Sequence, residues 1–254
     1  MRTLLLTLCL VLAGPAVAQP VAAAAAGALV VGSSGNRIAG SGRAVDDVRT
    51  PGSFSAIRVS GPIDVELKAS EREQVTVRFD DNLVSVVETQ VTTDTTPALE
   101  IRLQPGASFR SGGSPKVIVE FKSISSLSLS GSGDVHADAV RGPLMAVSVA
   151  GSSDVKVDRL DVDVLGVSIA GSGDFTAAGR AAEQGYSIAG SGDIKAENLV
   201  GQTVKVRIAG SGDARVNAEQ MLTVSIAGSG DVIYRGTPVV KKSVAGTGEV
   251  RKAN

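Results

Sequence analysis

Acidic residues recur along the C-terminal half of the chain at a spacing that could serve cation binding. Seven times a short phrase of a small residue, Ser or Thr, a second small residue and an acid appears, as in Gly171-Ser172-Gly173-Asp174. If successive copies stack as β-strands do, their carboxylates form a row with neighbours about 4.8 Å apart, and oxygen ligands of this kind suit calcium. The acidic residues of the row are Asp134, Asp154, Asp174, Asp193, Asp213, Asp231 and Glu249.

The sequence between the copies argues against a calcium site. Calcium takes about six to eight oxygen ligands, and glycine-rich calcium-binding β-rolls supply them from two phrases in each turn. Here no second Gly- and Asp-rich phrase follows about nine residues later, as the stretch 214–222 illustrates. We therefore predict no metal site and no cofactor, and we keep calcium binding by the acidic row as an alternative.

A structural role explains the repeated phrase with fewer requirements. Glycine reaches positive φ without steric cost, so Gly131, Gly133 and their equivalents would permit a sharp corner. The Ser hydroxyl and the Asp carboxylate can bond backbone N–H groups that are left free where the chain turns. Stacked carboxylates repel their neighbours by about 1 kcal/mol in water and by about 3 to 4 kcal/mol at an effective dielectric constant of about 20. Backbone donors, cations or water must offset that repulsion.

Residues that could carry catalysis lack suitable companions. His136 is the only histidine, and no cysteine of the mature chain could join it in a transition-metal site, so we expect it at the surface. The carboxylate pairs Asp161 with Asp163 and Asp46 with Asp47 could in principle cleave a glycoside, but no glycosidase motif accompanies them. The few aromatic residues fall mostly at positions expected to face inward. We predict no catalytic residues and no enzymatic activity, and a polysaccharide-processing enzyme is the weaker alternative.

The spacing of the phrase predicts the fold. Its copies begin 20, 20, 19, 20, 18 and 18 residues apart, a period typical of a solenoid whose turns bury one another's faces. Each unit carries three short apolar pairs, such as Val155 with Val157 and Val162 with Val164. We therefore predict an all-β fold, a single-stranded parallel β-helix of triangular section, which we expect to be right-handed. Length differences fall between the acid and the next lead-in, so that corner should absorb insertions.

The preceding region alternates in the same way but without a regular period. Ile63, Val65 and Leu67 would share one face of a strand, and Gly61-Pro62 marks a turn. The Gly-Ser-Gly-Asp phrase is missing from this region. We predict that residues 47–126 form irregular β turns that cap the solenoid, because an open first turn would expose strand edges to other chains. Residues 127–254 would form the regular solenoid.

The N-terminus predicts export. Arg2, an apolar run from Leu4 to Leu12 and the Ala16-Val17-Ala18 site are typical of a secretory signal peptide over residues 1–18. Residues 19–46 are rich in Ala and Gly, which predicts a flexible leader. The only cysteine, Cys9, lies in the signal peptide without a small residue before it, so we expect neither a lipid anchor nor a disulfide. No later stretch approaches the roughly 18 apolar residues of a transmembrane helix.

Several motifs together resemble one family of exported bacterial proteins. They are the stretch from Phe54 to Leu67, Asp80-Asp81-Asn82-Leu83, the repeated phrase with its Leu127-Ser128-Leu129-Ser130 lead-in, and the closing Ser243-Val244-Ala245-Gly246-Thr247-Gly248. From about Phe54 to the end, the chain is similar to the family described as putative auto-transporter adhesin, head GIN domain. The resemblance implies a β-helical fold and no established catalytic residues.

These observations predict an exported, non-enzymatic β-solenoid that acts as an adhesin-like or structural protein of the cell envelope. The net charge of −1 does not favour nucleic acid as a partner. We expect an envelope protein or a glycan surface as the partner, and a location in the periplasm or at the cell surface. The sequence leaves the ligand and the oligomeric state open.

Overall fold

The regular structure of the chain is almost entirely β. The computed structural model describes residues 37–93 and 95–253, all within the unit Asn36–Asn254. The only helix of these residues is a short 3₁₀ turn, η1 (Val84–Val86), and no described helix has the length and apolarity needed to cross a membrane. The predicted signal peptide and the leader up to residue 36 lie outside the described residues.

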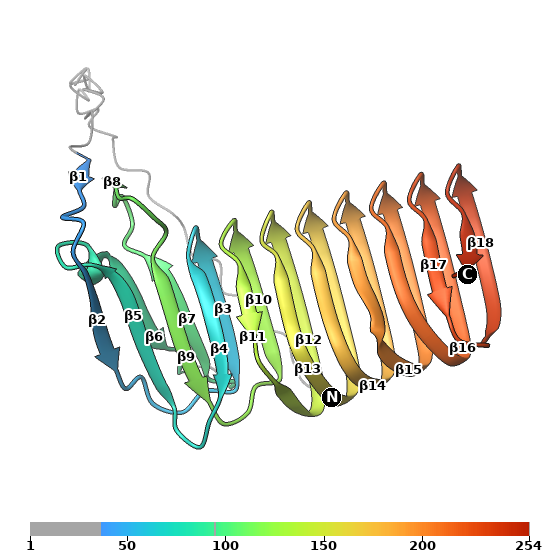
Figure 1. The fold of residues 1–254 in the computed structure, drawn as a ribbon, viewed down its shortest axis with the longest axis horizontal. Helices are drawn as coiled ribbons and strands as arrows, with labels where there is room; N and C mark the ends of the chain where they lie inside the picture. Colours follow the sequence, from blue (N-terminus) through green and yellow to red (C-terminus); the bar gives the residue numbers. More distant parts are fainter. Residues whose placement is uncertain (1–36, 94, 254) are drawn as a thin grey trace, which may run out of the picture. The chain divides into compact units, whose positions relative to one another are not determined.

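The C-terminal part is a stack of coils in which every strand pairs in parallel with its counterpart in the next coil (Figure 1). This confirms the predicted parallel β-helix. The strands of the stack are β10 (Ser126–Gly131), β11 (Val135–Ala137), β12 (Val140–Gly151), β13 (Val155–Gly171), β14 (Phe175–Gly190), β15 (Ile194–Gly210), β16 (Ala214–Gly228), β17 (Val232–Arg235), β18 (Val239–Gly246) and β19 (Val250–Lys252).

The register of the stack is fixed at the glycine corner. Gly151 pairs with Gly171, and Gly171 with Gly190, so identical positions of the repeat lie above one another. Where coils differ in length, the register shifts on the other side of the coil, for example between Thr176 and Ala178. The prediction that this second corner absorbs length differences is therefore confirmed.

The core runs along the inside of the coils. In β13 the inward residues form three groups: Val155 with Val157, then Leu160 with Val162, then Leu165 with Val167 and Ile169. We predicted the middle group as Val162 with Val164, and the second residue of that pair is wrong. The strand bends after Val162 and breaks the period of two, so Val164 is 39% exposed whereas Leu160 is 1% exposed.

One polar pair is buried among the apolar residues of the core. Tyr186 and Gln184 are each 2% exposed, and the Tyr186 hydroxyl donates to Oε1 of Gln184 at 2.9 Å. The Gln184 amide nitrogen donates to the backbone oxygens of Ala181 at 3.1 Å and Leu199 at 3.3 Å. Burial raises the pKa of Tyr186 well above its ordinary value, so this hydroxyl stays protonated.

In the N-terminal region the order of the coils in space differs from their order in the chain. The chain first makes a coil from β3 (Ala56–Gly61) and β4 (Asp64–Ala69), and later a second coil from β7 (Ala98–Leu103) and β9 (Lys116–Phe121). The later coil pairs in parallel with one side of the earlier coil. The other side of β3 and β4 pairs with β10 and β11, which continue into the regular stack.

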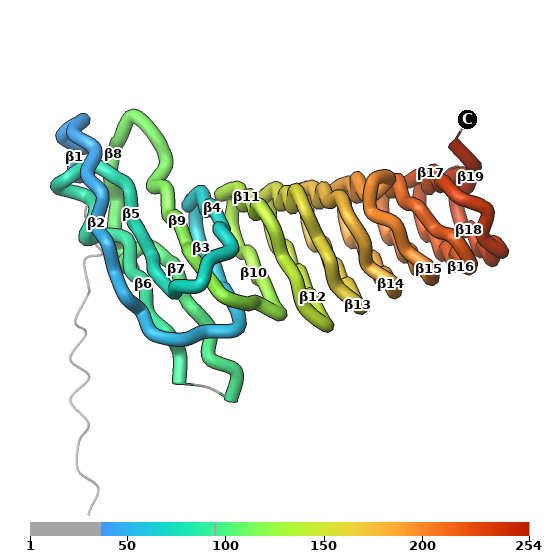
Figure 2. Tube along the Cα trace, turned by 60° about the horizontal axis from the view of Figure 1, so that its bottom comes forward, coloured from blue at the N-terminus to red at the C-terminus, as the bar shows by residue number. Residues whose placement is uncertain are grey.

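Antiparallel strands close the outer side of this region, as Figure 2 shows at its blue and green end. Strand β5 (Gln74–Asp80) pairs antiparallel with β9 and with β2 (Ala44–Arg49), and β6 (Val87–Val91) pairs antiparallel with β7. A small parallel pair joins β1 (Ile38–Ala39) to β8 (Phe109–Arg110). These strands form the irregular cap expected over this region, and they cover edges that would otherwise be free.

Strands β1 and β2 lie partly where the sequence predicted the end of a flexible leader. The inward side of β2 carries Val45, Asp47 and Arg49, and only one of the three is apolar. Arg49 donates to the Asp47 carboxylate at 2.7 Å and to the backbone oxygen of Val87 at 2.6 Å. Pairing with β5 and these polar contacts hold the strand, so the hydrophobic pattern does not reveal it.

Candidate functional site

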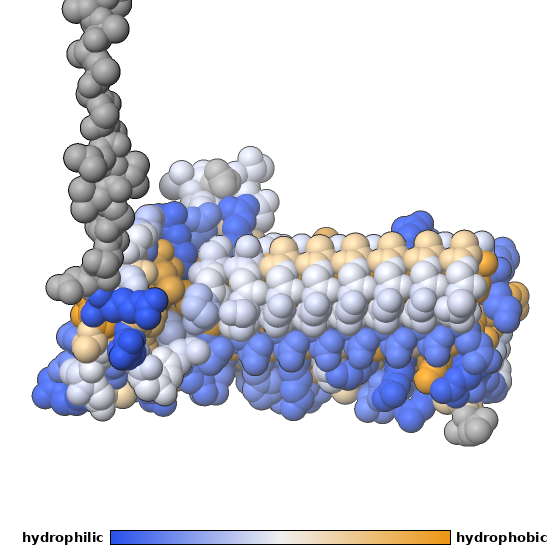
Figure 3. All heavy atoms as spheres, turned by 90° about the horizontal axis from the view of Figure 1, so that it is seen from above, coloured by the Kyte–Doolittle hydropathy of each residue, from blue (hydrophilic) through white to orange (hydrophobic). Residues whose placement is uncertain are grey.

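The acidic residues directly follow the corners of the coils. Seen from above in Figure 3, corner residues line up in rows along the stack: a pale row of alanines, white rows of glycine and serine, then a blue hydrophilic row. The first glycine of each phrase has positive φ, +136° at Gly171, and a Cβ there would collide with the backbone oxygen of Gly151. The second glycine, such as Gly173, has no positive φ, and Ser153 replaces it in one coil. Our prediction about positive φ is right for the first glycine only.

Each carboxylate of the row from Asp134 to Asp231 accepts a hydrogen bond from the backbone of the next coil. The N–H of Asp174 donates to Oδ1 of Asp154 at 2.9 Å, and the N–H of Asp193 donates to Oδ1 of Asp174 at 2.9 Å. A hydrogen bond to a charged acceptor contributes about 1.5 to 3 kcal/mol, which is the size of the repulsion between neighbours. We call this series the aspartate ladder: Asp64, Asp134, Asp154, Asp174, Asp193, Asp213, Asp231 and Glu249.

Asp64 belongs to the ladder although the sequence did not predict it. The N–H of Asp134 donates to Oδ1 of Asp64 at 3.2 Å, and Gly61 pairs with Gly131. The Gly-Ser-Gly-Asp phrase itself is absent from this region, but Gly61-Pro62-Ile63-Asp64 forms the equivalent corner in a divergent form. Its first Gly and its Asp keep their roles, while its two middle residues differ. Beyond Asp64 the register places Lys116 at the same position, so a cation ends the row.

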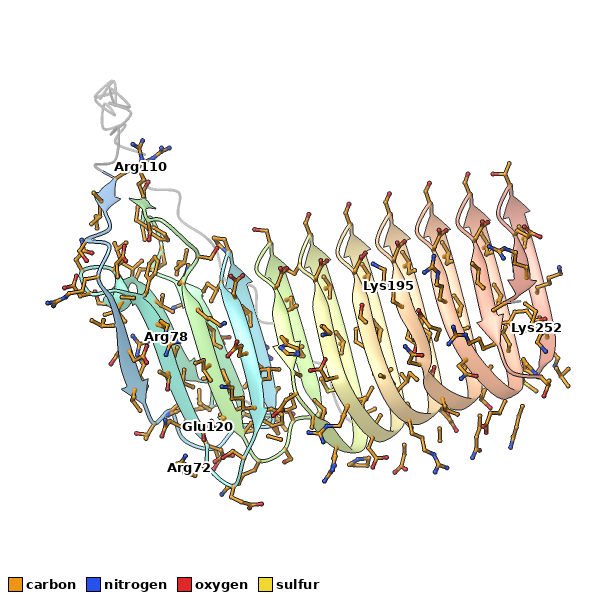
Figure 4. The ribbon with its side chains drawn as sticks, viewed as in Figure 1. Arg72, Arg78, Arg110, Glu120, Lys195 and Lys252 are labelled. Atoms are coloured by element: carbon orange, nitrogen blue, oxygen red, sulfur yellow. The ribbon has the colours of Figure 1, made fainter. Side chains whose placement is uncertain are left out.

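A second row, two residues after the acids, carries a Lys or Arg in half of its positions. These are Lys156, Lys195, Arg215 and Arg251, in register with Glu66, His136, Thr176 and Ile233. Lys195, labelled in Figure 4, places Nζ at 2.6 Å from Oδ2 of Asp174, and this contact holds the pKa of Lys195 above its ordinary value. Lys195 therefore supplements the backbone donor at Asp174.

The residues that the structure describes show no group of three or more His, Cys, Asp or Glu side chains that could hold a metal ion. The ladder explains this for its own members. The carboxylates are spread along the stack, one to a coil, and one oxygen of each carboxylate from Asp64 to Asp231 already accepts a backbone N–H.

His136 is an exposed residue, as expected. Its Nε2 lies 2.7 Å from Oδ2 of Asp158, and Nζ of Lys156 lies 3.1 Å from the other oxygen of the same carboxylate. Hydrogen bonds from His136 and then from Lys156 hold the pKa of Asp158 below its ordinary value. The three side chains form a surface ion-pair cluster.

The two carboxylate pairs considered for glycoside cleavage have other surroundings. Nε and Nη2 of Arg78 donate to Oδ1 and Oδ2 of Asp46 at 2.6 and 2.7 Å, and these hydrogen bonds lower the pKa of Asp46. A general acid needs the opposite shift. Asp161 and Asp163 are both exposed, on either side of the buried Val162 in β13.

A shallow groove of about 430 Å³ lies on an outer face of the coils, over β10, β12, β13, β14 and β15. We call it the glycine groove. One row of its floor is formed by Ala146, Gly166 and Gly185, and this row leads to Lys205. The adjacent row consists of Ser148, Ser168 and Ser187, and leads to Arg207.

Sequence reasoning did not identify this groove. Its signal is the occurrence of Gly166 and Gly185 inside lead-in strands, where glycine is not expected. Another hollow, of about 450 Å³, lies where the chain passes from the cap to the stack, beside Phe121 and Arg141. In that hollow the Asp138 carboxylate is already bonded to the backbone N–H groups of Ala69 and Ala139.

Several solved structures have the same fold. A putative adhesin from Bacteroides fragilis is 22% identical, with a TM-score of 0.80 over 85% of this chain and 100% of its own. A putative adhesin from Parabacteroides distasonis is 27% identical, with a TM-score of 0.66 over 86% and 100% of the two chains. A protein from the same species, described as a putative lipid binding protein, is 27% identical with a TM-score of 0.69 and the same coverage.

The search of curated proteins gives no match. A sequence family matches residues 53–238, which span both the capped N-terminal coils and most of the regular stack. The divergent corner at Gly61-Pro62-Ile63-Asp64 and the regular corners up to Asp231 all fall within this match. The chain therefore belongs to the family described as putative auto-transporter adhesin, head GIN domain.

Proposed function

We propose that this protein is an exported, non-enzymatic β-solenoid that acts by adhesion or as a structural component of the cell envelope. The observation that carries the proposal is the repetition on its outer faces. Ser148, Ser168 and Ser187 lie in register on one face, and the carboxylates of the aspartate ladder lie in register along the corner. Such rows offer the same weak contact many times, and linked weak contacts give strong overall attachment.

Sequence features that are typical of exported proteins support this proposal. Residues 1–18 carry the features of a signal peptide, and the family description refers to auto-transporter adhesins. We propose the periplasm or the cell surface as the location, and an envelope protein or a glycan surface as the partner. The description of one solved relative as a putative lipid binding protein makes vesicle binding a useful second measurement.

A deletion strain tests the proposal, with the gene restored in trans as the control. We expect loss of surface attachment or of envelope integrity, and retention of the purified chain by envelope fractions. Unchanged attachment, an intact envelope and no retention would together refute the proposal. Release of products from any of a broad panel of glycans would instead support the enzymatic alternative.

A further inference from the structure

The two glycines in the floor of the glycine groove are not required by the fold. Neither Gly166 nor Gly185 has positive φ. A Cβ on Gly166 would meet no atom within 4 Å, and one on Gly185 would meet only the backbone oxygen of Leu165 at 3.9 Å, an ordinary contact. Glycine inside a strand costs about 0.5 to 1 kcal/mol relative to alanine. The chain therefore carries a stability cost here that local geometry does not explain.

Other coils show that the same position accepts side chains. In register with Gly185 lie Lys205, then Thr223, then Lys241. The parallel register continues through this position in these coils, so glycine here belongs to the groove and is not a feature of the repeat. A bare strand surface often marks a place where a ligand approaches the backbone closely.

The second row of the groove offers free hydroxyl groups. Ser148, Ser168 and Ser187 are exposed and occupy equivalent positions in three successive coils, so they repeat about every 4.8 Å. Among the residues described, none of these three hydroxyls has a hydrogen-bond partner. They can both donate to and accept from a polymer that carries hydroxyl groups along its length.

Positive charge marks one end of the groove. Lys205 and Arg207 are exposed, and within the described part of the chain neither has an ion-pair or hydrogen-bond partner. Lys195, in contrast, is paired with Asp174. Two unpaired cations beside a row of hydroxyls complement a ligand that combines hydroxyl groups with a carboxylate.

We propose that the glycine groove binds a segment of an acidic polysaccharide. The sugar hydroxyls lie along Ser148, Ser168 and Ser187, and a carboxylate lies against Lys205 and Arg207. The bare backbone at Gly166 and Gly185 lets the sugar rings approach the sheet. This proposal rests on the adhesive function proposed above, because it names the ligand class that the adhesive surface would recognise.

Two double variants test the groove in the full exported chain. Gly166→Val with Gly185→Val fills the floor with residues that suit strands, and Lys205→Gln with Arg207→Gln removes the cations. Thr223→Val and Lys241→Gln are matched controls, because both residues lie in the same row beyond the groove. Binding to polygalacturonate and alginate is measured by calorimetry, with dextran as the neutral polymer. Urea unfolding follows the fold of each variant.

We expect the unchanged chain to bind an acidic polymer more tightly than dextran. Each double variant should weaken this binding at least about tenfold, while the controls stay within about twofold. The glycine variant should unfold at an equal or higher urea concentration than the unchanged chain, which separates loss of the site from loss of the fold.

The proposal would be overturned if the unchanged chain bound neither acidic polymer. It would also be overturned if both double variants bound the polymers as tightly as the unchanged chain does. Binding to phosphatidylglycerol vesicles that is lost in the glycine variant, without polysaccharide binding, would also overturn it and indicate a lipid. If envelope fractions retain the chain while neither polymer binds, this proposal fails and the adhesive function stands. If the polymers bind but deletion leaves attachment and the envelope unchanged, the adhesive function fails instead.

Discussion

The backbone N–H of Asp174 donates a hydrogen bond to Oδ1 of Asp154, one coil earlier, at 2.9 Å. The same bond joins the corners of neighbouring coils from Asp64 to Glu249. A side chain of one coil is thus bonded to the main chain of the next coil at the position where like charges lie closest. Substitution can separate the contribution of this hydrogen bond to stability from the contribution of the charge.

Asp154→Asn and Asp154→Ala make that separation. Asparagine keeps the Oδ1 acceptor and removes one charge from the row, so we expect the free energy of unfolding to stay equal or to rise. Alanine removes the acceptor and leaves the N–H of Asp174 without its partner, which should cost about 1 kcal/mol. Urea unfolding of the two variants measures the difference. Equal stability of both variants would show that the hydrogen bond contributes nothing.

Calcium should have no effect on thermal stability. One oxygen of each carboxylate from Asp64 to Asp231 already accepts a backbone N–H, and one acid in each coil supplies too few ligands for calcium. Melting curves recorded with millimolar calcium and with EDTA should therefore coincide. A rise in the melting temperature with calcium, reversed by EDTA, would favour the cation-binding alternative.

The two glycines of a corner should respond differently to substitution. Gly171→Ala places a Cβ at a φ of +136° and against the backbone oxygen of Gly151, so we expect a loss of about 2 kcal/mol or more. Gly173→Ser also brings a Cβ against a backbone oxygen, that of Ser153, but Gly173 has no positive φ and Ser153 itself carries a side chain at the equivalent position, so we expect a smaller loss than for Gly171→Ala. Chemical unfolding gives both values. The reverse order would contradict the role assigned to the first glycine.

The buried pair Tyr186 and Gln184 should behave as a unit. Tyr186→Phe leaves Oε1 of Gln184 buried without a donor, which should cost about 1 to 3 kcal/mol. Gln184→Leu leaves the Tyr186 hydroxyl without its acceptor and should cost a similar amount. The double variant should lose less than the sum of the single losses. Additive losses in a double-mutant cycle would show that the two side chains do not interact.

Asp158→Asn should lower stability at neutral pH but not in acid. The pKa of Asp158 is lowered in the folded state, so its contribution is present above about pH 3.8 and is lost as the pH falls through the lower folded-state value. The cluster is exposed, and the loss at neutral pH should stay below about 1 kcal/mol. Urea unfolding at several pH values measures it, with Asp161→Asn as an exposed control. A difference that persists at about pH 2 would contradict this linkage.

The regular stack could be predicted from the sequence because its signal is local. The spacing of the glycine corners gives the length of each coil. The apolar pairs, such as Val155 with Val157, show which side chains face the core. Val164 was assigned wrongly because a bend in the coil breaks the alternation that the prediction assumed. The pairing of β3 with both β7 and β10 could not be predicted, because it joins segments that are distant in the chain.

The candidate site was predictable in a similar, partial way. The row of acids followed from the repeat, whereas the donors that bond them are backbone groups, which a sequence does not display. Asp64 escaped prediction because Pro62 and Ile63 replace the middle of the phrase. In the sequence, only Gly166 and Gly185 indicate the glycine groove. They can be interpreted only once the structure shows that neither position requires glycine.

The placement of β3 and β4 has a consequence for the order in which the protein folds. Both partners of β3, namely β7 and β10, come later in the chain, so this coil cannot gain a neighbour on either side until those strands arrive. From β12 onward each strand pairs with one that precedes it. Folding should therefore have one slow, long-range step that joins the cap to the first coils, after which the stack grows from a formed end by fast local additions.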